Sequence, residues 1–292
     1  ASPNNFSFSN PRIYYIIKVV IKFVPFGGRM SLSIAPLYSS SSGNSTYIGS
    51  QKTGILIDAG LSGKYIFSAL EQLEIEKSFV KAILVTHEHA DHIKGVGVVS
   101  RKLDIPVYAN EATWDAMNKK IGEISPKNRI VIGKEDFFID DLLITPIPLF
   151  HDAADPTGYC VCAGDRKVCV ITDTGKVSKA MLTLVQGAQV ALIESNHDVR
   201  MLKCGSYPYE LKRRILSTHG HLSNEDCAAF AIDLVRQGVK GILLGHLSKE
   251  NNFEELAYNT VSEALLSAGI CPGRDVAIAL AKKYEVSRLI TI

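Results

Sequence analysis

Short apolar runs alternate with amphipathic segments along most of the chain. Runs that are apolar or alternate with period two, bounded by turn residues, predict strands. We expect strands at Ser33–Leu37, Ser45–Ile48, Gly54–Ile57, Ala82–Val85, Pro106–Tyr108, Leu142–Pro146, Tyr159–Ala163, Lys167–Ile171, Val190–Ile193, Gly241–Leu244 and Val276–Ala279. Apolar residues at helical spacing predict helices at Lys64–Leu73, Ile93–Leu103, Glu111–Lys120, Tyr209–Ser217, Ser223–Gln237 and Phe253–Ser267. Strands separated by helices predict an α/β protein whose layered sheets carry helices outside.

The first 29 residues differ from the rest of the chain. They include an apolar run, Ile13–Val24, that is only twelve residues long and is interrupted by Lys18 and Lys22. This run is too short to span a bilayer and lacks the small-residue cleavage site of a secretory signal, so we expect no stable membrane insertion. It fits an added leader before a start at Met30, a segment docked on the body, or a basic membrane-surface segment. We expect residues 1–29 to be a leader or extension and residues 30–292 to form one domain.

Composition places the chain among ordinary globular proteins. Of its 292 residues, 46% are apolar and 21% are charged, which excludes a disordered or fibrous class. The formal net charge is +2, but 28 basic and 30 acidic residues remain from Met30 onward. A nucleic-acid partner would therefore have to be recognised by local basic patches. Six cysteines without a C-x-x-C pair predict reduced thiols in a cytoplasmic protein.

The densest group of metal-binding side chains is the run Thr86-His87-Glu88-His89-Ala90-Asp91-His92, which follows the predicted strand Ala82–Val85. The chain has only 8 histidines, so three of them and an aspartate within six positions are not expected by chance. Side chains in such a turn point in different directions, so one loop can supply ligands to two adjacent ions. Imidazole and carboxylate groups suit Zn²⁺, Mn²⁺ or Fe²⁺.

Further metal-ligand candidates each stand where an apolar run ends and a loop begins. They are Asp58, His151, Asp173 and His246. Strand ends on one edge of a layered sheet bring their side chains into a common crevice, whereas histidines used for packing have no reason to follow strands so regularly. The sequence therefore predicts a metal site assembled from several strand ends.

These motifs resemble those of the metallo-β-lactamase fold superfamily. The resemblance rests on I-D-A-G at Asp58, T-H-E-H-A-D-H at His87 to His92, His151, T-D-T-G at Asp173 and G-H-L-S at His246. It covers nearly the whole chain from Met30 onward and implies a four-layer αββα sandwich with two divalent ions, Zn²⁺ or Mn²⁺, with Fe²⁺ as a further candidate. It implies that one ion is bound by His87, His89 and His151, that the other is bound by Asp91, His92 and His246, that Asp173 bridges them, and that Asp58 orients the histidines.

Within the superfamily, L-Y-S-S-S-S-G-N-S, E-S-N-H-D and H-G-H-L-S-N are similar to the YycJ/WalJ group of bacterial cytoplasmic hydrolases, which are described as DNA exonucleases. Asp173 stands where zinc β-lactamases usually have cysteine, and His89 stands where the oxygen-reducing di-iron branch has glutamate. A carboxylate shared by two ions suits phosphodiester hydrolysis by a hydroxide held between them. The resemblance therefore implies a nucleic-acid substrate, DNA or RNA, with DNA bearing a 5′-phosphate favoured.

Two other functions fit the same residues. A thioester or lactone hydrolase of this superfamily would use the same ligands, and a regulatory protein could retain the fold without catalysis. Loss of a ligand would be the sign of a regulatory protein, and every ligand is present. Nothing in the sequence favours a particular oligomeric state.

A serine-rich segment between two predicted strands is a candidate phosphate cradle. Small hydroxyls, a flexible glycine and exposed backbone N–H groups at Ser40, Ser41, Gly43 and Asn44 could bind a substrate phosphate, and the other interpretation is a polar turn.

A second loop, Thr218 to Asn224, precedes a predicted helix. His221 could bind the scissile phosphate or give a proton to the leaving oxygen, and Ser223 and Asn224 could hold a terminal phosphate. The structural alternative is that Ser223 only caps the helix. With the metal site, these residues predict Asp91, Asp173 and His221 as the catalytic set. Basic residues nearby could contact backbone phosphates, or they could simply form a solvated helix face. They are Arg200, Lys203, Lys212, Arg213 and Arg214.

Overall fold

The computed structural model describes residues 30–292, and these residues fold around two mixed sheets. The first sheet contains β14 (Ile290–Thr291), β1 (Ser33–Ser40), β2 (Gly43–Gly49), β3 (Gly54–Ile57), β4 (Val80–Leu84), β5 (Val107–Ala109) and β6 (Arg129–Val131), in that order. The second contains β13 (Ala277–Leu280), β12 (Gly241–Gly245), β11 (Val190–Glu194), β10 (Arg166–Ile171), β9 (Thr157–Ala163), β8 (Leu142–Pro148) and β7 (Phe137–Ile139). The predictions for residues 1–29 lie outside the described residues.

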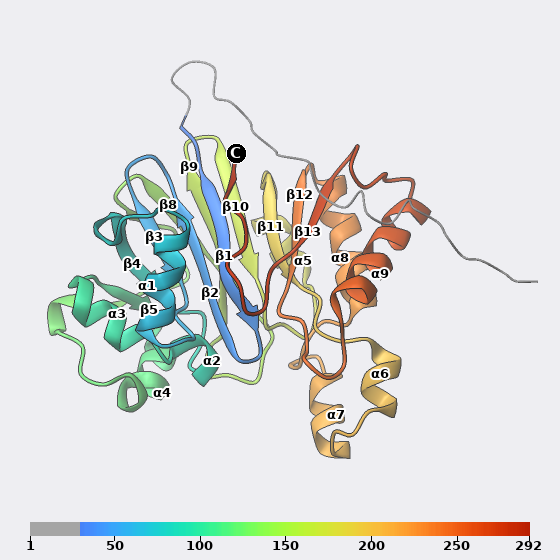
Figure 1. Cartoon of the computed structure of the whole chain (residues 1–292), viewed down its shortest axis with the longest axis horizontal. Helices are drawn as coiled ribbons and strands as arrows, with labels where there is room; N and C mark the ends of the chain where they lie inside the picture. The colour runs from blue at the N-terminus through green and yellow to red at the C-terminus, as the bar shows by residue number, and fades with distance from the viewer. Residues whose placement is uncertain (1–29) are drawn as a thin grey trace, which may run out of the picture.

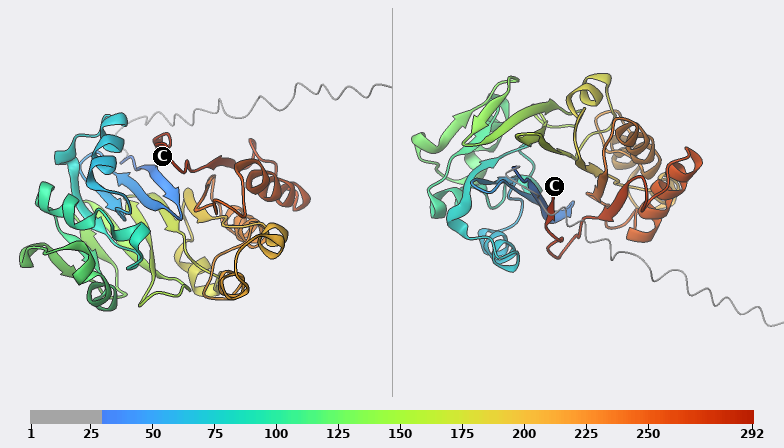
Figure 2. Two further views of the ribbon diagram at one scale, coloured as in Figure 1. Left: turned by 60° about the horizontal axis from the view of Figure 1, so that its bottom comes forward. Right: turned by 90° about the horizontal axis from the view of Figure 1, so that it is seen from above.

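Helices cover the outer faces of both sheets (Figures 1 and 2). The first sheet carries α1 (Gly63–Gln72), α3 (Val96–Leu103) and α4 (Glu111–Ile121), and the second carries α5 (Lys179–Leu184), α8 (Asn224–Arg236) and α9 (Glu254–Ser267). The short helices α2 (Ala90–Ile93), α6 (Val199–Cys204) and α7 (Tyr209–Ile215) lie toward one end of the sandwich (Figure 1). None of the helices between residues 30 and 292 is long and apolar enough to cross a membrane.

Alternation along the strands builds the layers. Ile55 and Ile57 of β3 pack in the core between the two sheets, whereas Leu56 faces the helices of the first sheet. In β11, Leu192 likewise faces the opposite sheet and Ile193 faces the helices. Both of these strands thus bury their two faces, as strands in a sheet covered on both sides do. The predicted αββα four-layer sandwich is confirmed.

Each predicted strand is present, but some elements were not predicted. The missed strands are very short: β6 and β7 have three residues each and β14 has two. So few residues show no recognisable alternation of apolar and polar side chains. The predicted helix Ile93–Leu103 is divided into α2 and α3, because the N–H of Gly95 donates to the carbonyl of Ala59 at 2.7 Å and leaves the helical ladder.

The expectation of six free thiols is wrong for one pair. Cys160 on β9 and Cys169 on β10 face each other across the antiparallel register, with their Cα atoms 4.2 Å apart, and they form a disulfide. The pairing is a cross-strand contact that neither cysteine's own sequence context reveals. The other four cysteines are free.

Candidate metal centre

The predicted metal ligands converge where strands of both sheets end. Strand β3 is parallel to β4 in the first sheet, and β10, β11 and β12 are parallel to one another in the second, so the carboxyl ends of these strands lie at one edge of each sheet. Asp58 follows β3, Asp173 follows β10 and His246 follows β12, while His87 to His92 follow β4 and His151 follows β8. The groups that could hold a cation include each of the seven predicted ligands. The residues that were predicted at strand ends therefore do lie close together in the tertiary structure.

Three of these strand-end residues have a left-handed backbone conformation. The φ angles of Asp58, Asp173 and His246 are 61°, 60° and 54°. This conformation costs about 1 kcal/mol or more for residues other than glycine, so the surrounding structure has to hold it. It turns each side chain sharply out of its strand and toward the shared edge. Three of the six left-handed residues other than glycine in the described part of the chain thus lie at the candidate metal centre.

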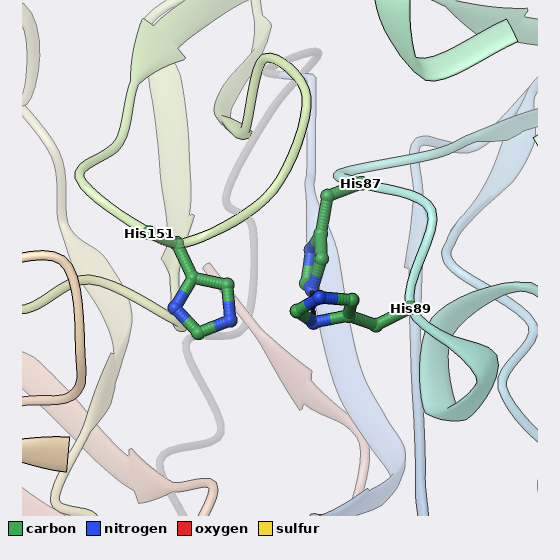
Figure 3. Close-up of side chains that lie close together, drawn as sticks. All are labelled: His87, His89 and His151. Atoms are coloured by element: carbon green, nitrogen blue, oxygen red, sulfur yellow. Dashed lines mark hydrogen bonds between the residues drawn. The ribbon is translucent and has the colours of Figure 1, made fainter. Parts of the chain in front are cut away.

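The first ligand group consists of His87, His89 and His151, whose candidate ligand atoms lie within 4.8 Å of one another. Figure 3 shows His151 reaching from a separate loop toward the other two rings. The Nδ1 atom of His151 donates to the carbonyl of Gly220 at 3.1 Å, which leaves Nε2 for a ligand. Burial and the charge of His92 lower the pKa of His87 well below its usual value. A neutral imidazole of this kind is the form that binds a metal.

The second ligand group consists of Asp91, His92 and His246. The Nδ1 atom of His92 donates to Asp58 Oδ2 at 2.7 Å, and its Nε2 lies 3.3 Å from Asp173 Oδ2. Asp58 thus fixes the ring of His92, one of the predicted metal ligands. His87, His92 and Asp173 form a further group, which links the two ligand groups through the Asp173 carboxylate.

Two buried atoms support a cation at this position. Asp173 Oδ2 and His246 Nε2 are both buried, and neither has a hydrogen-bond partner among the described residues. Buried polar atoms without partners are costly, whereas a divalent cation would satisfy both. The donor set of imidazole and carboxylate groups also suits Zn²⁺, Mn²⁺ or Fe²⁺. The residues therefore fit a divalent metal site.

Electrostatics link the carboxylate and the histidines of the site. Burial raises the pKa of Asp173, but the charges of His246 and His92 outweigh it and hold this pKa well below its usual value. Burial lowers the pKa of His246, but the carboxylates of Asp173 and Glu194 outweigh it and raise this pKa to about 9. Without a metal, protonated histidines thus supply the positive charge that Asp173 needs. A bound cation would replace those protons.

Thr86 and Glu194 also contact the candidate ligands, and the sequence analysis did not single out Thr86 and assigned Glu194 no chemical step. Thr86 Oγ1 donates to Asp58 Oδ2 at 2.8 Å and lies 3.0 Å from His87 Nδ1 and 3.2 Å from His92 Nδ1, so it contacts both ligand groups. Glu194 has no exposed surface, and its Oε1 lies 2.6 Å from His221 Nδ1 and 3.0 Å from His246 Nδ1. Its position at the end of the apolar strand β11 is the same signal that identified Asp58 and Asp173.

His221 lies beside the metal ligands but is held by Glu194. Its side chain is 18% exposed, and its Nδ1 is 3.7 Å from Asp173 Oδ1. Burial lowers the pKa of His221, but the Glu194 carboxylate outweighs it and raises this pKa above its usual value. Because Nδ1 faces Glu194, the Nε2 atom is available to a substrate.

The serine-rich segment joins the site through one side chain. It forms the ends of β1 and β2 and the turn between them, in which Ser41 is exposed and Ser40 and Gly43 are buried. The side chain of Asn44 donates to Asp91 Oδ2 at 3.3 Å and lies 3.1 Å from His92 Nε2. Asn44 is thus in contact with the second ligand group.

The predicted phosphate contacts of Ser223 and Asn224 need correction. Ser223 caps α8, because its Oγ accepts from the Asp226 N–H at 3.0 Å and donates to the Asp226 carboxylate at 2.7 Å. Asn224 is fully buried, and its side-chain amide bonds with Ser195 and Asn252. Both side chains hold loops together. A polar loop before a helix has the same sequence pattern whether its side chains bind phosphate or only hold the loop.

Comparisons with known proteins agree with this geometry. Residues 53–246 match the family model described as the Beta-lactamase superfamily domain. The chain is 45% identical over 245 residues to exodeoxyribonuclease YycJ of Bacillus anthracis, covering 84% of this chain and 93% of that protein. It is 46% identical over 255 residues to exodeoxyribonuclease WalJ of Streptococcus pneumoniae, covering 86% of this chain and 93% of that protein.

A solved structure supports the fold independently of close sequence similarity. The metallo-β-lactamase fold protein YhfI of Bacillus subtilis superposes with a TM-score of 0.66 at 14% identity, covering 88% of this chain and 99% of that chain. A likeness at this identity concerns the fold alone. Together, the fold, the ligand set and the relatives show that the chain belongs to the metallo-β-lactamase superfamily and, within it, to the family that contains the exodeoxyribonucleases YycJ and WalJ.

Proposed function

We propose that this protein is a metal-dependent exodeoxyribonuclease that hydrolyses phosphodiester bonds at the ends of DNA. The position of Asp173 carries the proposal. Its buried carboxylate lies 3.3 Å from His92 Nε2, 3.1 Å from His246 Nδ1 and 3.9 Å from His151 Nε2. A carboxylate shared by two ligand groups suits a pair of ions that act on a phosphoryl centre. The names of the two relatives above support DNA as the substrate.

We infer that the cofactor is two divalent ions, Zn²⁺ or Mn²⁺, with Fe²⁺ as a further candidate. His87, His89 and His151 would hold one, Asp91, His92 and His246 would hold the other, and Asp173 would be shared. Bound ions supply Lewis acidity and lower the pKa of water, so that a nucleophile is available at neutral pH. The partly exposed members, His89 and Asp91, face the side from which a substrate can approach.

His221 is the proposed proton donor. The Glu194 carboxylate stabilises its protonated form and fixes Nδ1, so Nε2 can give a proton to the leaving oxygen or bind a phosphoryl oxygen. Asp91 and Asp173 complete the proposed catalytic set. Asn44, held against Asp91 and His92, has an amide that can face a phosphoryl oxygen, and the exposed Ser41 beside it extends the proposed phosphate contacts with Ser40 and Gly43.

The proposed substrate is DNA with a 5′-phosphate, and the proposed location is the cytoplasm, where chromosomal DNA of a bacterium would lie. The exposed hydroxyls of Ser41 and Ser42, in the turn beside Asn44, support this preference because they suit a terminal phosphate.

A degradation assay tests this function. The purified protein is incubated with 5′-phosphorylated and 5′-hydroxyl forms of DNA and RNA, each with Mn²⁺, Zn²⁺ or a chelator. We expect release of nucleotides from DNA ends with a metal and none with the chelator. Hydrolysis of a thioester substrate without degradation of DNA would contradict the proposal and indicate the acyl hydrolase. The variant His221→Ala should lose turnover while it keeps its metal content, and loss of the metals instead would make His221 a ligand.

A further inference from the structure

Helix α7 ends directly against the metal centre. The carbonyl of Ile215, its last residue, accepts from the N–H of His221 at 3.1 Å. A Cβ added to Gly220 would overlap the carbonyl oxygens of Arg214 and Ile215, so only glycine allows this close approach. The carbonyl of Gly220 in turn accepts from His151 Nδ1 at 3.1 Å. The last turn of α7 is therefore fixed relative to both His151 and His221.

Arg214 lies in this last turn and reaches the site through one carboxylate. Its Nε forms an ion pair with Asp152 Oδ2, and Asp152 Oδ1 lies 3.3 Å from His151 Nε2. The Arg214 side chain is 50% exposed. Because Nε makes this contact, the two terminal nitrogens of the half-exposed guanidinium are left for another partner. A guanidinium that is oriented by its Nε and open at its terminal nitrogens is suited to a second anion.

Arg213, the preceding residue, is arranged differently. Its guanidinium pairs with Glu210 one turn earlier on the same helix at 3.0 Å, and its side chain is 70% exposed. Exposed pairs of this kind contribute little to stability or binding. The two neighbouring arginines carry the same charge, but only Arg214 contacts a residue beside a metal ligand.

We propose that Arg214 binds the DNA backbone at the phosphate next to the one held at the metal centre. This inference rests on the proposed function. Asp152 holds the guanidinium in place through Nε, and the terminal nitrogens bind two oxygens of that phosphate. Because the contact is to the second phosphate, Arg214 aligns a strand of nucleotides without touching the reacting phosphorus. It is a positioning residue that distinguishes a polynucleotide from a small phosphodiester.

The test compares Arg214→Ala with Arg213→Ala as the matched control. Binding is measured by fluorescence anisotropy with a 5′-phosphorylated oligodeoxynucleotide whose phosphorothioate linkages slow its hydrolysis. We expect Arg214→Ala to weaken binding about 10-fold or more and to reduce the slope of log Kd against log salt by about one, because one phosphate contact is lost. Arg213→Ala should change Kd by less than about twofold. Arg214→Lys should recover part of the affinity, since it keeps the charge but lacks the planar fork.

A small substrate separates phosphate binding from a structural role. Bis(p-nitrophenyl) phosphate has a single phosphodiester, so Arg214→Ala should hydrolyse it with unchanged kcat/KM and should keep the wild-type metal content. If metal content and this hydrolysis fall together with DNA binding, Arg214 acts through Asp152 and His151, and the inference is overturned. If the wild type degrades DNA but Arg214→Ala binds DNA as tightly as Arg213→Ala does, the inference about Arg214 is overturned and the proposed function stands. A wild type that neither binds nor degrades DNA overturns the proposed function as well.

Discussion

The Glu194 carboxylate contacts two histidines through one oxygen, with Oε1 lying 2.6 Å from His221 Nδ1 and 3.0 Å from His246 Nδ1. His246 belongs to a ligand group, and His221 is the proposed proton donor. Burial raises the pKa of Glu194, but the charge of His221 outweighs it and lowers this pKa to about 2. The carboxylate is therefore ionised and fixes the Nδ1 side of both rings. One buried residue thus contacts both a candidate metal ligand and the proposed proton donor.

Replacing this carboxylate tests the link. Glu194→Gln keeps the size of the side chain but removes its charge, so its oxygen accepts more weakly from the two Nδ1 atoms and no longer stabilises a protonated His221. We expect turnover or metal affinity to fall about 10- to 100-fold, as is typical when the partner of a metal-binding histidine is lost. Both are measured, by steady-state hydrolysis and by metal analysis. Glu225→Gln, on the exposed face of α8, is the control and should match the wild type. Full activity in Glu194→Gln would refute the role.

The shared carboxylate should be indispensable. Asp173→Asn keeps a side chain that tolerates the left-handed backbone at this position but removes the charge available to a cation. We expect hydrolysis to fall to the background rate and the metal content to fall at least about 10-fold. The circular dichroism spectrum should be unchanged. An Asp173→Asn variant as active as the wild type would exclude this site.

His89 offers a second test of the ligand set, because it is only partly buried and its loss should spare the fold. His89→Ala should abolish hydrolysis in the metal-loaded protein. The matched control is His219→Ala, since His219 is exposed and belongs to none of the ligand groups. Equal activities of the two variants would argue against the His87, His89 and His151 group.

Asp58 should act on metal affinity through His92. It accepts from His92 Nδ1 at 2.7 Å and from the N–H and hydroxyl of Thr86 at 2.8 Å. Asp58→Asn removes the charge that orients His92, and we expect metal affinity to fall about 10- to 100-fold, measured by titration with a competing chelator. Asp104 is also left-handed but pairs with Lys127 at the surface, so Asp104→Asn is the control and should bind metal normally.

Metal removal should destabilise the fold. Asp173 Oδ2 and His246 Nε2 are buried without partners among the described residues, so a bound cation stabilises the native state. At a free metal concentration 100 times Kd, one site adds about 2.7 kcal/mol to the free energy of unfolding. Thermal unfolding with a chelator and with increasing Mn²⁺ or Zn²⁺ measures this, and an unchanged Tm would count against binding.

Thiol titration checks the cross-strand disulfide. The protein unfolded without reductant should show four reactive thiols, from Cys162, Cys204, Cys227 and Cys271. After reduction all six cysteines should react. Six thiols before reduction would mean that Cys160 and Cys169 are not joined.

The sequence predicted the layers and the convergence of the candidate ligands because both leave local signals. Alternating apolar residues mark strands buried on two faces, and a histidine or aspartate directly after such a strand marks the shared edge. The candidate ligands from His87 to His92 stand out as one dense run, and Asp58, Asp173 and His246 stand out at strand ends. These signals depend only on a residue's near neighbours along the chain.

Tertiary structure decided what each of the remaining polar residues does. Ser223 and Asn224 looked like phosphate contacts, but packing against Asp226, Ser195 and Asn252 uses their side chains. Glu194 meets His221, 27 residues later, and His246, 52 residues later, so no local pattern reveals its two contacts. The same holds for the Cys160 and Cys169 pair, which depends on strand register. Local periodicity fixes which elements form, whereas the partner of a polar group depends on how distant loops meet.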